Sequence, residues 1–219
     1  IQGGNYDFIL KPETFDATLD VKSVTIYALK GAGAATFFED LITNGDCEGS
    51  GNANFVCRNY GKADYNPVFE EGIGMDGTKG IKFETTAMVA NPWDNQFFIT
   101  VPDFGPMTTA NKIHVKMNVK AAKEASIGTQ AHAAPGEYKH YAFINNVSFK
   151  TDWTTHEFTG NVSADGVFSI AFNMNDFADA NTYYFDNIVW EIEKKSESGG
   201  IPQTPEQKRD TLAWAMDQW

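Results

Sequence analysis

Apolar and polar residues alternate over short runs along most of this chain, and the runs are separated by segments rich in Gly, Asn, Asp and Pro. Alternation with a period of two is typical of β-strands, in which successive side chains point to opposite faces of a sheet. Many short strands of this kind, with no alternation of strands and helices, predict an all-β fold built as a β-sandwich. The expected strands are residues 21–29, 80–85, 96–101, 112–119, 127–131, 138–144, 155–161, 167–174 and 183–191.

Three parts of the chain differ in composition. Residues 1–40 hold strand segments and a linker of small residues, and we interpret them as the end of a preceding module. Residues 41–193 carry most of the strand signals, so we expect them to form one compact β domain. Residues 194–219 begin with a linker rich in Ser and Gly and continue into a helix.

The helix predicted near the C-terminus has both a start signal and an apolar face. Thr204 is a good N-cap, Pro205 suits the first helical position, and Gln207 completes a capping box. An unpaired apolar face needs a partner surface, and the helical pattern continues to Trp219 without a C-cap. We therefore expect this helix to belong to an adjoining domain and the chain to be a fragment of a longer protein. The apolar positions are Leu212, Ala215, Met216 and Trp219.

The chain is acidic, with 17 basic residues against 29 acidic residues and a formal net charge of −12 at pH 7. An acidic surface repels phosphate backbones and anionic membranes, so nucleic acids and membrane surfaces are disfavoured as partners. No apolar run approaches the roughly 20 residues that a membrane-spanning helix needs. The composition therefore favours a neutral polymer as the ligand.

Amides and an imidazole fall on matching faces of two predicted strands. Gln96 lies on one face of its strand, and Gln130 and His132 share one face of theirs. If the two strands are neighbours, they offer amides on the same open face. Amides exchange hydrogen bonds with hydroxyl groups, and the indole of Trp93 offers a flat surface to a sugar ring. Asn173 opposes the apolar side chains of its own strand, so it is a further candidate in what resembles a sugar-binding cleft.

Simpler interpretations stay open at each of these positions. Trp93 can instead plug the edge of the sandwich, and the Gln side chains can be solvated surface residues. The pattern around Tyr138 does not show which face of its strand is open. His132 and His140 flank one turn, but two imidazoles without a third ligand are a weak metal signal, so hydrogen bonding to hydroxyl groups is the better interpretation.

The chain has two cysteines, Cys47 and Cys57, in the segment CEGSGNANFVC. Metal sites usually need more sulfur or histidine at tighter spacing. We expect a disulfide that closes this Gly- and Asn-rich loop, which would suit an exported protein. The alternative is a pair of buried free thiols.

Signals for catalysis are missing from the sequence. A glycosidase needs two carboxylates that face each other across the scissile bond, and the acidic residues give no recognisable pair in an aromatic pocket. The chain also lacks GxSxG, HExxH, P-loop and dinucleotide-binding motifs. We therefore expect no catalytic residue.

Five segments taken in order, NGDCEG, NPWDNQFFITV, GTQAHAAPGEYKHY, SIAFNMND and ANTYYFDNIVWE, resemble carbohydrate-binding modules of families four, nine and twenty-two. The resemblance covers residues 41–193 and is closest to modules from xylan-degrading enzymes of gut Bacteroidetes. It implies a β-jelly-roll sandwich whose concave face holds a cleft for single β-1,4-linked chains such as xylan. The segment IPQTPEQKRDTLAWAMDQW is similar to a helix of family-ten xylanases, which implies a linked xylanase catalytic domain as a partner.

The resemblance also implies roles for individual residues, including a structural calcium away from the cleft. Calcium takes several oxygen ligands, and carboxylates at the two ends of the domain can meet if its first and last strands are neighbours. From spacing alone, Asp and Gly in loops are more often turn formers. The implied calcium ligands are Glu48 and Asp186, to which the turn GMDGTKG adds Asp76. The implied cleft residues are Trp93, Gln96, Gln130, His132, Tyr138 and Asn173.

Together these observations predict a non-catalytic, monomeric carbohydrate-binding module that targets a xylanase to xylan or xylooligosaccharides. The expected disulfide and the resemblance place it in a bacterial protein that is secreted, at the cell surface or periplasmic. A jelly-roll lyase or hydrolase that acts on the same glycan, and a structural spacer between domains, are the alternatives.

Overall fold

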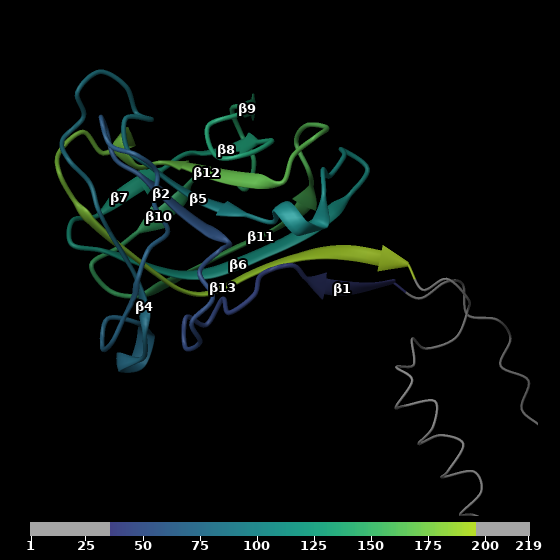
Figure 1. Ribbon diagram of the computed structural model, residues 1–219, viewed down its shortest axis with the longest axis horizontal. Helices are drawn as coiled ribbons and strands as arrows, with labels where there is room; N and C mark the ends of the chain where they lie inside the picture. Colours follow the sequence, from purple (N-terminus) through teal and green to yellow (C-terminus); the bar gives the residue numbers. More distant parts are fainter. Residues whose placement is uncertain (1–35, 196–219) are drawn as a thin grey trace, which may run out of the picture.

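Two antiparallel sheets pack face to face across residues 36–195, which are the residues that this computed structural model describes (Figure 1). The first, called here the β6 sheet, has the strand order β11, β6, β13, β4 and β3, and β1 also pairs with β13. Figure 1 shows β1 and the end of β13 extending together beyond the rest of the sandwich. The strands of the β6 sheet are β1 (Thr36–Asp40), β3 (Phe69–Glu70), β4 (Gly80–Glu84), β6 (Lys112–Ala121), β11 (Thr154–Asn161) and β13 (Thr182–Lys195).

The second sheet, called here the β5 sheet, has the strand order β2, β5, β12, β8 and β9. A separate two-stranded sheet consists of β7 and β10, both labelled in Figure 1. The bounds are β2 (Phe55–Arg58), β5 (Gln96–Thr100), β7 (Ala125–Ile127), β8 (Thr129–His132), β9 (Tyr138–His140), β10 (Val147–Phe149) and β12 (Ser169–Asn173). Three single-turn 3-10 helices complete the described elements: η1 (Met75–Gly77), η2 (Pro102–Phe104) and η3 (Met174–Asp176).

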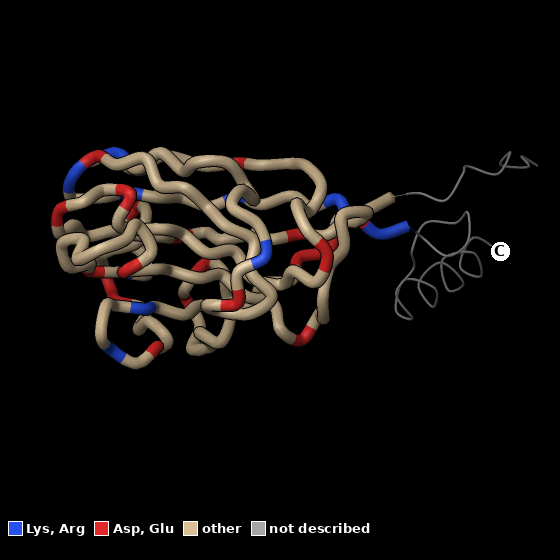
Figure 2. The backbone as a smooth tube through the Cα atoms, turned by 90° about the horizontal axis from the view of Figure 1, so that it is seen from above, with Lys and Arg blue, Asp and Glu red and all other residues tan. Residues whose placement is uncertain are grey.

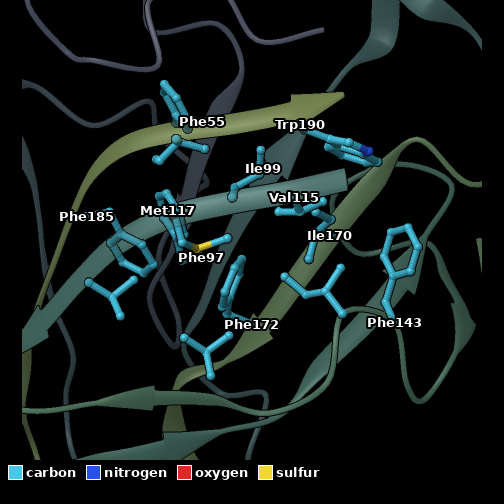
Figure 3. Close-up of a cluster of buried hydrophobic side chains, with 14 of the residues drawn as sticks. Phe55, Phe97, Ile99, Val115, Met117, Phe143, Ile170, Phe172, Phe185 and Trp190 are labelled. Atoms are coloured by element: carbon cyan, nitrogen blue, oxygen red, sulfur yellow. The ribbon is translucent and has the colours of Figure 1, made fainter. Parts of the chain in front are cut away.

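Aromatic rings fill the space between the two sheets (Figure 3). The ring of Phe97 on β5 stacks on Phe185 of β13 with 4.2 Å between centroids, and it lies 5.8 Å from the ring of Phe172 on β12. Each fully buried ring contributes roughly 1.5–3 kcal/mol through removal of apolar surface from water. This contact therefore joins the central strands of both sheets and sets which face of each strand points inward.

The two central strands differ in what covers their outward side. β6 alternates between buried side chains such as Val115 and Met117 and more exposed side chains such as Lys116, as expected for a sheet with one face in water. Every residue of β5 and β12 is buried on both faces. The outward face of the β5 sheet is therefore covered by other parts of the chain.

The predicted all-β sandwich is confirmed, and most predicted strands lie within one or two residues of the observed ones. The strand predicted at 127–131 is divided at Gly128, whose N–H donates to Asp176 Oδ2 at 2.6 Å instead of continuing one ladder. The strand predicted at 138–144 ends at His140, because Phe143 and Ile144 turn into the core. The short strands β1, β2, β3 and β10 were not predicted.

The domain boundaries also differ from those predicted. β1 pairs with β13 through the register Thr36↔Lys195 to Asp40↔Glu191, so the β domain begins before residue 41 and reaches past residue 193. The strand predicted at 21–29, the linker before residue 36 and the C-terminal helix lie outside the described residues.

Charged residues are spread widely over the sandwich. Figure 2 shows acidic and basic positions interspersed along its loops and strands. Within residues 36–195, none of the helices has the length and apolar character needed to cross a membrane.

Candidate functional site

The outward side chains of the β5 sheet form a continuous face, because the strand registers place them side by side. Phe97 and Ile99 point into the core, so Gln96, Phe98 and Thr100 point outward. The same alternation holds on the neighbouring strands, and it places Gln96 and Gln130 on one face, as predicted from their spacing. Three rows cross this outer face: Arg58–Gln96–Asn173, Val56–Phe98–Ala171–Gln130 and Thr100–Ser169–His132–Tyr138.

The polar groups of this outer face bond to one another. Gln96 Nε2 donates to Asn173 Oδ1 at 3.0 Å, and these side chains are only 4% and 8% exposed. His132 Nε2 donates to Gln130 Oε1 at 3.0 Å, since a carboxamide oxygen can only accept. Four of the predicted site residues therefore lie together, in two bonded pairs. Gln96, Asn173 and His132 are buried, however, and not on an open face as expected; Gln130 is half-buried.

Of these four residues, His132 is the one with a fully buried polar atom that is left unpaired. Its Nδ1 is buried and has no hydrogen-bond partner among the described residues. Burial, with a smaller contribution from the nearby Arg58 charge, lowers the pKa of His132 to about 4. The imidazole is therefore neutral at pH 7, and with Nε2 protonated its Nδ1 is a free acceptor.

Arg58 and the turn after β8 cover the middle of this face. The guanidinium carbon of Arg58 lies 5.1 Å from the ring centroid of Phe98, which is 0% exposed. Arg58 donates to both carboxylate oxygens of Asp64, at 2.8 and 2.7 Å. These bonds raise the pKa of Arg58, which stays charged. Arg58 therefore covers Phe98, which is the one phenyl ring in the three rows of this outer face.

Two of the predicted site residues are exposed, in contrast to the buried residues of the three rows. Trp93 is 51% exposed, in the turn that precedes β5, which argues against its being a plug at the sandwich edge. Tyr138 is 54% exposed, and its ring packs edge-on against His132 with 6.0 Å between centroids. This answers the question of orientation on β9, because Tyr138 lies on the outer face.

The turn that carries Trp93 is held firmly from within. Asp94 Oδ2 accepts hydrogen bonds from the N–H groups of Val89, Ala90 and Asn91 at 2.6–3.0 Å. These bonds lower the pKa of the Asp94 carboxyl, which stays ionised and keeps the turn closed. The backbone that carries the indole is therefore fixed by these bonds.

Two of the three predicted calcium ligands lie near each other. Asp186 is fully buried at the bulge in β13, and its Oδ2 accepts from Met75 N at 2.8 Å and Thr78 Oγ1 at 3.2 Å. Burial raises the pKa of Asp186, and the nearby Glu48 charge adds to that rise. Asp76 is exposed at the tip of η1, so its turn reaches Asp186 through Met75 and Thr78.

The chemistry of this region fits a hard cation. Asp186 is a buried carboxylate beside a second carboxylate, and no basic side chain forms a salt bridge to it within residues 36–195. Burying a carboxylate is costly, and hydrogen bonds from Met75, Thr78 and Asn187 offset only part of that cost for Asp186, whereas Glu48 itself is exposed. The same residues contain no group of three His, Cys, Asp or Glu side chains able to hold a metal, so a calcium ion here would draw its other ligands from carbonyl, hydroxyl or water oxygens.

The predicted disulfide between Cys47 and Cys57 is not found, and both residues are buried free thiols. Cys47 Sγ donates to Gly45 O at 3.8 Å, near Asp186, whereas Cys57 points into the core from β2 beside Tyr65. Burial raises the pKa of both thiols to about 12. Nearness in sequence did not bring the two sulfurs together, because β2 carries Cys57 into the sheet while Cys47 stays in the loop.

A hollow of about 270 Å³ lies at the other end of β5 from Trp93. It is formed by the loop that follows β1 and by η2, with Phe104 exposed at its side. None of the predicted site residues lines this hollow. Its lining is Leu41, Thr43, Gly51, Ala53, Asn54, Val101, Pro102, Asp103 and Phe104.

Comparison with known proteins gives likenesses of structure only. No family model matches the chain, and no curated protein sequence matches it. The CBM22-1 xylan-binding domain from Paenibacillus barcinonensis Xyn10C has a TM-score of 0.51 and 13% identity, covering 73% of this chain and 97% of that domain. The CBM22-1–CBM22-2 tandem domain of the same protein has a TM-score of 0.50 and 13% identity, covering 76% of this chain and 50% of that one.

A third structure, described as "CBM4 structure and function", has a TM-score of 0.48 and 18% identity, covering 69% of this chain and 99% of that chain. At such identities the two likenesses that reach a TM-score of 0.5 show the fold alone. The described part of this chain thus folds as a β-sandwich of the carbohydrate-binding-module type.

Proposed function

We propose that this chain is a non-catalytic carbohydrate-binding module for single β-1,4-linked glycan chains, with xylan and xylooligosaccharides as the preferred ligands. The observation that carries this proposal is the outer face of the β5 sheet. It carries paired amides, a neutral imidazole and the exposed ring of Tyr138, and the exposed indole of Trp93 lies in the turn that leads into β5. Flat rings beside hydrogen-bonding amides are the chemistry that a pyranose chain needs.

Several further observations support a neutral glycan as the ligand. The net charge of −12 disfavours polyanions. The fold resembles that of a xylan-binding domain, at a TM-score of 0.51. No motif for catalysis occurs in the chain. Binding by one module should be weak, since a stacked ring adds only about 0.5–1.5 kcal/mol beyond its buried area. Its use to a linked xylanase would be avidity, and we propose such an enzyme as its partner in a secreted or cell-surface bacterial protein.

Isothermal titration with xylohexaose, with cellohexaose in parallel, tests the proposal. We expect enthalpy-driven binding of xylohexaose and weaker or no heat with cellohexaose. Trp93→Ala should abolish retention on xylan with little change in melting temperature, because this indole is half exposed. Phe38→Ala is the control, since Phe38 is an exposed ring on the β6 sheet. Release of reducing sugar by the purified chain would instead identify an enzyme, and no binding by the wild type would favour a spacer.

We also propose a structural calcium held by Glu48 and Asp186, which would neutralise their charges and tie the loop after β1 to β13. Chelation should lower the melting temperature by about 5–10 °C if calcium is present at about one hundred times its dissociation constant. Glu48→Gln should abolish that shift. Glu71→Gln should keep it, since Glu71 lies in the same region but bonds only to Lys79. An unchanged melting curve after chelation would remove calcium from the proposal.

A further inference from the structure

Phe98 is fully buried, but not because it belongs to the core between the two sheets. It points away from the core, toward the outer face, yet it is 0% exposed. Its neighbours across the strands are small or aliphatic: Ala171 on β12 and Val56 on β2. The His132 ring packs edge-on against that of Phe98, with 5.7 Å between the two ring centroids. A ring this flat and this well supported is a stacking surface, but it faces a side chain of the same molecule instead of solvent.

The side chain that covers Phe98 is Arg58, and few contacts hold its guanidinium in place. It stacks on Phe98 at 5.1 Å and forms its ion pair with Asp64, whose side chain is 36% exposed. A longer contact of 3.5 Å joins its Nη2 to the carbonyl of Pro135 in the turn after β8. The two side chains of the ion pair are about one-third exposed, so water screens their attraction, and a cation over a single ring adds only a small further stabilisation. The cover is therefore weakly held.

The turn after β8 has a glycine where it passes the guanidinium of Arg58. Gly136 has φ +88°, and a Cβ at that position would lie 2.7 Å from Nη1 of Arg58. Any other residue at 136 would be strained in its backbone and would push against the guanidinium. The Gly136 turn and the Phe98 ring thus both lie against the guanidinium of Arg58.

Displacing the guanidinium would complete a binding surface whose other parts are already in place. Phe98 would become a platform between the Gln96–Asn173 pair and the Gln130–His132 pair, with the small side chains of Ala171 and Ser169 leaving its floor flat. A sugar ring stacked there would have amides within reach on both sides. The free Nδ1 of His132 could accept a bond from a hydroxyl group.

We propose that the Arg58–Asp64 pair is a displaceable cover and that Phe98, beneath it, is the central stacking platform for the glycan. This inference rests on the proposed function and deepens it by naming the platform and what restricts access to it. The covered form binds no sugar on Phe98, so the apparent affinity is reduced by the fraction of molecules in which Arg58 has moved aside.

The test is titration of xylohexaose into Arg58→Ala and Asp64→Ala. Both variants should bind about three- to tenfold more tightly than the wild type, since each weakens the cover. The control is Lys82→Ala, which removes the Lys82–Glu70 pair on the β6 sheet and should leave affinity unchanged. Affinity of the wild type for this neutral ligand should also rise with ionic strength, because salt screens the exposed pair, whereas Asp64→Ala should show no such rise.

Phe98→Leu in the Arg58→Ala background should return affinity to the wild-type level or below, and melting curves would show that the double variant is folded. Equal or weaker binding by Arg58→Ala, when the wild type binds, would overturn the cover while leaving the proposed function intact. Weaker binding in particular would make Arg58 a ligand contact. Binding by Arg58→Ala alone would support both proposals, and no binding by any variant would overturn both.

Discussion

The two outer faces of the sandwich come from the same alternating pattern but have opposite characters. The outward side chains of β6 in the middle of its sheet are Lys112, His114, Lys116, Asn118 and Lys120, and all are exposed or half-buried. The outward side chains of β5 are Gln96, Phe98 and Thr100, and all are buried. A charged face remains in water. A face of mutually bonded amides with a covered ring is largely excluded from water.

The two histidines on these faces express the same difference. His114 Nδ1 lies 2.6 Å from Glu191 Oε2 and its Nε2 lies 2.9 Å from Glu157 Oε1, so its surroundings favour the charged form. The bonds to Glu191, followed by those to Glu157, raise the pKa of His114. On the β5 sheet, burial lowers the pKa of His132 to about 4. The first face stabilises an imidazolium, and the second excludes it.

The largest expected effect is acid destabilisation through His132. Its pKa falls from 6.5 to about 4 on folding, so the folded state disfavours proton uptake. Its contribution to stability is therefore complete above pH 6.5 and is lost as pH falls from there through pH 4. The total is on the order of 3 kcal/mol. Urea denaturation of the wild type and His132→Gln at pH 7 and pH 4 measures it.

His132→Gln should lose less stability than the wild type between those two pH values, because glutamine does not titrate. Carboxylates titrate in both proteins, so their effects cancel in the difference. Equal losses in the two proteins would mean that His132 is accessible to water and that the β5 face is open.

A smaller difference between the two outer faces should appear in the unfolding free energy when one side chain is removed from each. Gln96→Ala leaves Asn173 Oδ1 without its donor at a buried position and should cost about 1–3 kcal/mol of unfolding free energy. Lys116→Ala, at an exposed outward position of β6, should change it by less than about 0.5 kcal/mol. Chemical denaturation at pH 7 compares them. A loss for Gln96→Ala as small as that for Lys116→Ala would show that water replaces the missing donor.

The alternation of the sequence was sufficient to predict the sandwich and the face on which Gln96, Gln130 and His132 meet. An alternation with a period of two shows which side chains share a face of their strand, even when the order of the strands is unknown. It could not reveal Arg58, because the short strand β2 was hidden between Gly- and Asn-rich segments. The nearby Asp64 gave no signal either, since acidic residues in loops are common. Phe98 could have been found, because it is an apolar residue on a face otherwise assigned to amides.

Contacts between distant residues account for the other differences. The disulfide prediction relied on the spacing of Cys47 and Cys57, which says nothing of where β2 lies relative to the loop before it. The prediction that Glu48 and Asp186 meet relied on the pairing of the first and last strands, and β1 does pair with β13. The expected strand pairing predicted this contact better than sequence spacing predicted the disulfide, because the first and last described strands are neighbours in one sheet.

The smallest expected effect is on the β6 face, where His114 joins β6 to β11 and β13. Its folded pKa is raised, so its contribution to stability is complete below its unfolded pKa and is lost as pH rises through its folded pKa. Because Glu157 is exposed and Glu191 is partly so, the contribution should stay below about 1 kcal/mol. His114→Gln should therefore flatten the stability profile above neutral pH, the opposite side from His132→Gln. High salt should shrink the effect of His114 and leave that of the buried His132 almost unchanged. Equal salt sensitivity at both histidines would mean that the two outer faces do not differ in solvent access.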